Sequence, residues 1–140
     1  MNAIYCKGDT TYHYASELPK SLRPYVDYQF SSGPVTGEDF NSFSRKFRNA
    51  VKALLPSGFE LHQWSRNHYY CTAVVKTPDG AFLYVSIPDV RWSTNGWLTN
   101  ILCRTMAHEK DWCGGPNHYA SLFNLGEKLQ YLWRMSKEAR

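Results

Sequence analysis

The sequence lacks any apolar run that approaches the roughly 20 residues needed to span a bilayer. Its first residues also lack the basic start and apolar core of a signal peptide. We therefore expect a soluble protein of the cytoplasm that makes no contact with a membrane. Only 4 cysteines are present, and none of them forms a C-x-x-C pair. Because thiols stay reduced in the cytoplasm, disulfide bonds are not expected.

Common catalytic signatures are absent as well. The sequence contains no G-x-x-x-x-G-K-[ST], G-x-G-x-x-G or G-x-S-x-G pattern, which are the phosphate-binding loops and the nucleophile turn of hydrolases. His108-Glu109 begins like the metalloprotease pattern H-E-x-x-H, but Trp112 stands where the second histidine belongs. These absences favour a non-enzymatic protein.

Aromatic residues, by contrast, are abundant: 10 Tyr, 7 Phe and 5 Trp make up 16% of the 140 residues. With 43% hydrophobic and 20% charged residues, the composition is that of a globular protein and not of a disordered chain. The length fits a single domain, which we place over residues 1–140. The net charge of +4 is a mildly basic balance that is compatible with an acidic partner or a nucleic acid.

The hydrophobic periodicity predicts an α+β fold. We expect an irregular, aromatic-rich N-terminal arm over residues 1–35 and an α+β core over residues 36–140. The clearest helix is predicted over residues 36–55, where apolar residues from Phe40 to Leu55 recur with a 3.6-residue period.

Three β-rich segments follow, and their order predicts a three-stranded antiparallel meander. Residues 59–66 alternate between apolar and polar, residues 68–76 are rich in β-formers, and residues 81–87 form the return strand. Two further helices are predicted over residues 95–109 and 117–138. The meander is therefore expected to pack against two or three helices.

Cysteine and histidine recur every five residues in one C-terminal segment, at Cys103, His108, Cys113 and His118. Thiolates and imidazoles are the ligands that zinc prefers, so this segment is a candidate metal site or the centre of a Cys/His metal-dependent enzyme. A helix over residues 95–109 opposes this hypothesis, because five residues turn a helix about 140° past a full turn. The segment also fits a plain structured loop shaped by Gly114-Gly115-Pro116. We expect no cofactor, with zinc as the alternative.

A strip of basic residues is predicted along the first helix and the strand after it, at Arg45, Arg48, Lys52 and Arg66. Because cations contact phosphates, this strip is a candidate nucleic-acid-binding surface. The alternative is an ordinary solvated helix face.

Tryptophan and arginine recur in and beside the predicted helix over residues 95–109. These two residue types are enriched at the energetic centres of protein interfaces. The candidate protein-binding surface consists of Arg91, Trp92, Arg104, Lys110, Asp111 and Trp112. The alternative for Trp92 and Trp97 is that both fill the core between sheet and helix.

Four segments of the C-terminal half carry a resemblance, namely residues 86–92, 97–105, 108–112 and 114–119. They resemble a small uncharacterised type of protein found in phages and conjugative elements of Gram-positive bacteria. The resemblance implies a mobile-element context in a bacterial host, and it carries over no functional residue. Small proteins of that context often inhibit host defence by binding a partner, as anti-CRISPR proteins do.

We therefore expect a non-enzymatic binding protein that inhibits a host nuclease or defence complex, in the manner of an anti-CRISPR protein, by protein–protein contact. The expected partner is a host defence protein or a ribonucleoprotein complex, and a homodimer is compatible with the sequence. The alternatives are a nucleic-acid-binding protein that uses the basic strip and a Cys/His metal-dependent enzyme.

Overall fold

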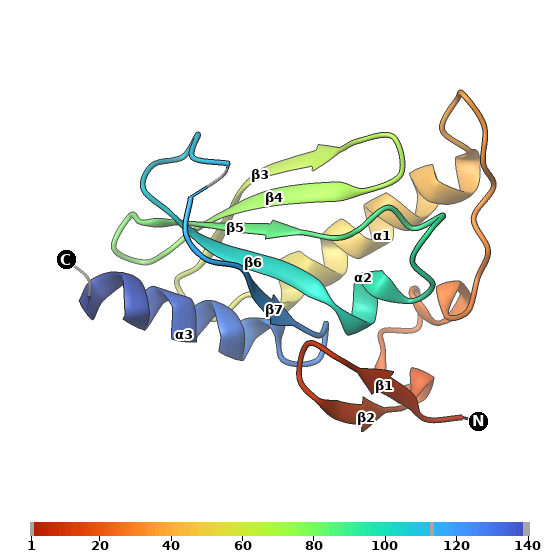
Figure 1. Cartoon of the computed structure of the whole chain (residues 1–140), viewed down its shortest axis with the longest axis horizontal. Coiled ribbons are helices and arrows are strands. Elements are labelled where there is room, and N and C mark those ends of the chain that lie inside the picture. The colour runs from red at the N-terminus through yellow and green to blue at the C-terminus, as the bar shows by residue number, and fades with distance from the viewer. Residues whose placement is uncertain (1, 113, 139–140) are drawn as a thin grey trace.

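The computed structural model describes residues 2–112 and 114–138 and has an α+β architecture (Figure 1). A five-stranded antiparallel sheet carries two long helices, and a small two-stranded sheet lies beside it. The strands are β1 (Ile4–Cys6), β2 (Thr11–His13), β3 (Glu60–Arg66), β4 (Cys71–Lys76), β5 (Phe82–Ser86), β6 (Ile101–Met106) and β7 (His118–Ala120). The helices are α1 (Glu38–Leu54), α2 (Gly96–Thr99) and α3 (Leu125–Glu138), with single 3₁₀ turns at Ala15–Glu17 and Arg23–Tyr25.

The large sheet is a meander in which each strand pairs with its neighbour along the chain, in the order β3-β4-β5-β6-β7. The predicted α+β class is confirmed, and α1, β3, β4 and β5 fall within the ranges predicted for them. The predicted extent of the meander is wrong, because the sheet has five strands and not three.

The helix predicted over residues 95–109 is wrong apart from one turn. Helix α2 ends at Thr99, and the following residues form β6 between β5 and β7. Ile101 and Cys103 are fully buried, whereas Leu102 and Arg104 between and after them are partly exposed. This two-residue period belongs to a strand, and the neighbouring strands supply hydrogen-bond partners on both sides.

The helix predicted over residues 117–138 begins later than expected. Residues His118–Ala120 form the edge strand β7, and α3 starts at Leu125. Its apolar stripe of Leu125, Leu129 and Leu132 is fully buried. Among the described residues, no helix combines the length and the apolar character needed to cross a membrane.

Helices α1 and α3 cover the same face of the large sheet (Figure 1). Helix α1 buries Phe40, Phe43 and Phe47 there, as its apolar stripe predicts. The Phe43 ring packs edge-on against Trp97 of α2, with 5.2 Å between ring centroids. Trp97 is therefore a core residue, in agreement with the alternative that we gave for it.

The N-terminal region differs from the irregular arm that we predicted. It contains the hairpin of β1 and β2, and it contributes buried side chains to the core: Cys6, Leu18, Leu22, Tyr25 and Phe30. The hairpin turn lies against the end of α2, because the Gly8 amide donates to the Thr99 carbonyl at 2.8 Å. A Cβ atom at Gly8 would overlap the carbonyl oxygen of Ala120, so this approach requires glycine.

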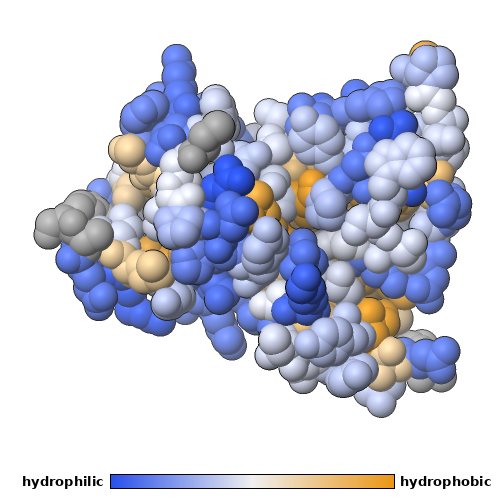
Figure 2. Space-filling view, in the orientation of Figure 1, coloured by the Kyte–Doolittle hydropathy of each residue, from blue (hydrophilic) through white to orange (hydrophobic). Residues whose placement is uncertain are grey.

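The opposite face of the sheet is bordered by the loop between β6 and β7, described over residues 107–112 and 114–117, which rises beside β5 and β6 (Figure 1). In the space-filling view, apolar surface shows in the hollow beside this loop (Figure 2). The outer strand β3 is interrupted by a bulge between Leu61 and Gln63. The residue at the bulge, His62, lies beside Phe82 of β5, with 5.1 Å between ring centroids.

Candidate functional site

Three arginines of the predicted basic strip meet in one pocket where α1 passes the edge strand β3. We call it the arginine pocket, and its volume is about 440 Å³. Its lining residues are Glu38, Asn41, Ser44, Arg45, Arg48, Trp64 and Arg66. The fourth residue of the predicted strip, Lys52, lies one helical turn beyond Arg48 on the same side of α1.

The local folding of two elements creates this pocket. On α1, Arg45 and Arg48 are three residues apart, so their side chains leave the same side of the helix. On β3, Trp64 and Arg66 are two residues apart, so both point to the face that α1 covers. The Trp64 ring packs against Phe47 of α1, with 5.8 Å between ring centroids, and this contact fixes the floor of the pocket.

The arginines of the pocket lack carboxylate partners within the part of the chain that the structure describes. Among the described residues, Arg45 donates only to Ser42 Oγ and Arg66 only to the Asn67 carbonyl, each at 3.3 Å. All three arginine side chains are exposed. Nearby, the buried Oδ1 of Asn41 has no hydrogen-bond partner among the residues that the structure describes. The pocket thus presents the positive charge and the hydrogen-bond donors of three arginines to an external ligand.

The predicted protein-binding surface is split by the sheet topology. The loop after β5 holds Arg91 and Trp92, and the loop after β6 holds Lys110 and Trp112. Because β5 and β6 are antiparallel, the two loops leave opposite ends of the sheet (Figure 1). The structure therefore does not bring the six predicted residues together.

At the first of these ends, the Arg91 guanidinium pairs with an acid of its own loop. Its guanidinium donates to both carboxylate oxygens of Asp89, at 3.0 and 2.7 Å, and lies 4.4 Å from the centroid of the Tyr69 ring. These hydrogen bonds hold the pKa of Asp89 below its ordinary value. The guanidinium also lies 5.2 Å from the centroid of the Trp92 ring, and Trp92 is 76% exposed, so it is not a core residue.

At the second end, Arg104 holds the described parts of the loop between β6 and β7. This side chain donates to Asn117 Oδ1 at 2.7 Å and to the Trp112 carbonyl at 2.9 Å. Its guanidinium lies 5.7 Å from the centroid of the Tyr84 ring, and the Trp112 ring meets Tyr84 edge-on. The arrangement leaves Trp112 46% exposed.

Two acids complete the framework of this loop. Asp111 accepts a hydrogen bond from the Ala107 amide at 2.9 Å, so it closes the turn, and the adjacent Lys110 is exposed. Glu109 lies 2.8 Å from the imidazole of His62, which lowers the pKa of that carboxyl. A hollow of about 710 Å³ borders the loop and the start of β5.

The predicted zinc ligands are only partly brought together. Cys103 and His118 are direct neighbours on β6 and β7, but Cys103 is fully buried, and burial raises the pKa of its thiol to about 12. His108 is exposed in the loop after β6 and lines the hollow there. Cys113 lies outside the described residues. Within residues 2–112 and 114–138, these ligands form no close group of three or more.

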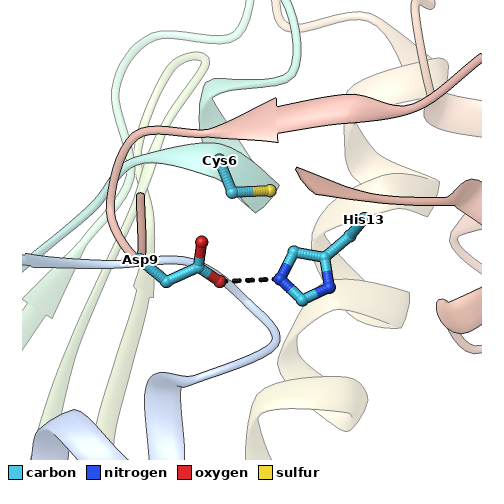
Figure 3. Close-up of side chains that lie close together, drawn as sticks. All are labelled: Cys6, Asp9 and His13. Atoms are coloured by element: carbon cyan, nitrogen blue, oxygen red, sulfur yellow. Dashed lines mark hydrogen bonds and ion pairs between the residues drawn. The ribbon is translucent and has the colours of Figure 1, made fainter. Parts of the chain in front are cut away.

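The structure does bring together three other potential metal ligands, which the sequence did not predict. Cys6, Asp9 and His13 meet at the hairpin of β1 and β2 (Figure 3). We call them the hairpin cluster. Burial and the acids Asp9 and Glu17 raise the pKa of the Cys6 thiol to about 11, so the thiol is not an activated nucleophile at neutral pH. The sequence feature that could have predicted this hairpin is Gly8-Asp9, a turn pair between two short β-compatible segments.

Comparisons of the chain with protein-family models, with curated proteins and with solved structures found no match. Function is therefore inferred from the geometry and the charges of these sites.

Proposed function

We propose that this protein is a non-enzymatic binding protein that holds a single-stranded nucleic acid in the arginine pocket. The observation that carries the proposal is the convergence of Arg45, Arg48 and Arg66, none of which has a carboxylate partner among the described residues. Guanidinium groups match phosphate oxygens with paired hydrogen bonds, so three of them together favour a phosphate backbone.

The rest of the pocket supports a nucleotide over a simple anion. Trp64 is partly exposed in the pocket and offers a ring on which an unpaired base can stack. The volume of about 440 Å³ lies in the range that accommodates a small organic group. Lys52 extends the line of cations along α1 past the pocket, in the direction that a continuing backbone would follow.

Salt-dependent binding is the direct test. Fluorescence anisotropy with a labelled single-stranded oligonucleotide is expected to show affinity that falls as salt rises. Three phosphate contacts predict a slope of about −2 in the plot of log affinity against log salt concentration. Arg45→Ala, Arg48→Ala and Arg66→Ala are each expected to weaken binding about tenfold and to reduce the slope by up to about one phosphate contact.

Arg134→Ala is the matched control, because Arg134 is an exposed helical arginine on α3 outside the pocket. Trp64→Phe tests the stacking role while it keeps an apolar contact to Phe47. It is expected to weaken binding of the single strand more than binding of a duplex of equal length. Absence of binding at low salt, or an equal loss with Arg134→Ala, would exclude the arginine pocket as the binding site.

A second candidate function is inhibition of a host nuclease or defence complex by protein–protein contact, as the sequence resemblance implies. The observation that favours it is Trp112, which is 46% exposed and is held in place by Arg104 and Tyr84. A preorganised aromatic side chain loses little conformational entropy on binding and is typical of interface centres.

The test is capture of a partner from a nuclease-treated lysate of a Gram-positive bacterium. The captured protein is expected to be lost with Lys110→Ala plus Trp112→Ala. It is expected to be retained with Trp92→Ala, because Trp92 is equally aromatic and more exposed but lies at the opposite end of the sheet. Equal capture by all variants would exclude the Trp112 surface.

A further inference from the structure

The hairpin cluster combines one thiol, one carboxylate and one imidazole at a single point. Cys6 ends β1, Asp9 lies in the turn and His13 ends β2, so the hairpin itself brings the three side chains together (Figure 3). One ligand atom from each residue lies within 4.8 Å of the other two. Zinc with bonds of about 2.0–2.3 Å holds tetrahedral ligand atoms about 3.3–3.8 Å apart, so shifts of about 1 Å bring the three atoms to that spacing, and the Asp9 and His13 atoms, which lie 2.8 Å apart, move outward.

The surroundings of His13 match those of a histidine that binds a metal. Its Nδ1 lies 3.1 Å from a carboxylate oxygen of Glu17, while Nε2 faces Asp9 at 2.8 Å. Metal-binding histidines generally donate the other ring N–H to a carboxylate, which fixes the tautomer and directs the second nitrogen to the ion. The imidazole also stacks on Phe123, with 4.0 Å between ring centroids. The stacking and the two contacts of its nitrogens together fix the orientation of the ring.

The carboxylate of the cluster is fixed in a similar way. Asp9 Oδ1 accepts from the Thr11 amide at 3.0 Å, and Oδ2 accepts from Ser121 Oγ at 2.6 Å. Cys6 is fully buried, whereas the side chains of Asp9 and His13 are 8% and 18% exposed. An ion bound here is therefore shielded on the thiol side and reaches solvent on the side of the carboxylate and the imidazole.

We propose that Cys6, Asp9 and His13 bind one zinc ion, with water as the fourth ligand. On binding, the Cys6 S–H bond breaks, the proton leaves to solvent and the sulfur–zinc bond forms, with no change of oxidation state. The ion ties β1 to β2, and through Ser121 and Phe123 it ties the hairpin to the segment before α3. This site is independent of the nucleic-acid-binding function proposed above.

Cobalt(II), which replaces zinc and has visible absorption, tests the site directly. The full-length protein is treated with a chelator under reducing conditions and titrated with cobalt. One equivalent is expected to produce a tetrahedral spectrum with a thiolate-to-cobalt charge-transfer band, and zinc is expected to remove it. Cys6→Ser is expected to abolish the charge-transfer band. Cys71→Ser, the matched change of a buried cysteine outside the cluster, is expected to keep it.

Two further variants keep the proposal falsifiable if Cys6→Ser does not fold. Glu17→Gln removes the charge that orients His13 without removing a ligand, and it is expected to weaken zinc affinity about 10–100-fold. Cys103→Ser addresses the alternative site predicted around His118. The proposal is overturned if no charge-transfer band forms, or if the band survives Cys6→Ser and disappears with Cys103→Ser. It is also overturned if zinc fails to raise the melting temperature of the chelator-treated protein.

Discussion

Two groups of arginines, both recognisable in the sequence, differ in what surrounds their charges. Arg91 and Arg104 are bound by their own loops: Arg91 pairs with Asp89, and Arg104 donates to Asn117 and to a backbone carbonyl. In the arginine pocket, by contrast, the hydrogen bonds of Arg45 and Arg66 within the described part of the chain are long and go to neutral neighbours. All of these residues are hydrophilic and lie at the surface, so composition alone does not separate the two groups.

The difference indicates two uses of the same side chain. A guanidinium whose donors are satisfied internally orders the loop that carries it, and its removal leaves an unpaired acceptor behind. A guanidinium without an internal partner contributes little to folding, because exposed cations are well solvated. It retains its charge and its donors for an external anion. The partners of an arginine therefore predict whether its loss affects stability or binding.

The largest effect is expected when the arginine pocket is neutralised completely. The triple variant Arg45→Ala, Arg48→Ala and Arg66→Ala should lower affinity for a single-stranded oligonucleotide about 1,000-fold at low salt, because three phosphate contacts are lost. Its free energy of unfolding should change by less than about 0.5 kcal/mol per residue. Anisotropy and urea denaturation measure the two quantities. A stability loss that parallels the binding loss would remove the distinction between the two groups.

Arg91→Ala should give the reverse result. It leaves the Asp89 carboxylate without its cation and removes the cation that contacts the Tyr69 and Trp92 rings. The melting temperature is expected to fall by about 3–6 °C, while oligonucleotide affinity stays within twofold of wild type. Thermal denaturation followed by circular dichroism measures the first effect. Trp92→Ala, which leaves the pair with Asp89 intact, should cause a smaller shift.

Arg104→Ala is expected to act locally. The loop between β6 and β7 loses the donor that holds Asn117 and the Trp112 carbonyl, so residues 107–112 open more often. Amide hydrogen exchange at Ala107 and Asp111 should become about tenfold faster, and exchange in the central strand β4 should not change. Equal acceleration in β4 would mean that Arg104 stabilises the whole domain and not the loop alone.

The smallest effect concerns pH. Arg91 depresses the pKa of Asp89, so this pair contributes stability above the ordinary carboxyl pKa of about 4 and loses it as pH falls through the lower folded-state value. Asp89→Asn should therefore be less stable than wild type at pH 6, and the difference should shrink below about pH 4. Urea denaturation across pH 2.5–6 measures it. A difference that is constant with pH would mean that the charge of Asp89 is not responsible.

The sequence predicted the parts of the fold that local periodicity determines. The stripe from Phe40 to Val51 specified α1, and the alternation in β3, β4 and β5 specified three strands. Leu98, Ile101, Leu102 and Met106 also fit a helical spacing, so the local pattern wrongly predicts a helix over residues 101–106. Pairing with β5 over five residue pairs decides their conformation, and this pairing is a long-range property.

The candidate sites were predictable to different degrees for the same physical reason. The arginines at positions 45 and 48 share one helix face, so their proximity follows from helical geometry. The approach of Arg66 and Trp64 to them depends on how α1 packs against β3, which no local pattern encodes. In the hairpin cluster, Cys6 and His13 meet only because β1 and β2 pair, and both strands have only 3 residues. Such short strands leave almost no periodic signal.

The bulge in β3 has a consequence for self-association. An outer strand offers unpaired backbone groups, and a strand from a second molecule can add to it and start an aggregate. Here the register shifts between Leu61 and Gln63, so a straight incoming strand cannot pair along the whole edge. The same shift places His62 beside Phe82 and Glu109. One extra residue in β3 therefore builds a contact within the protein and makes its outer edge a poor template for polymer growth.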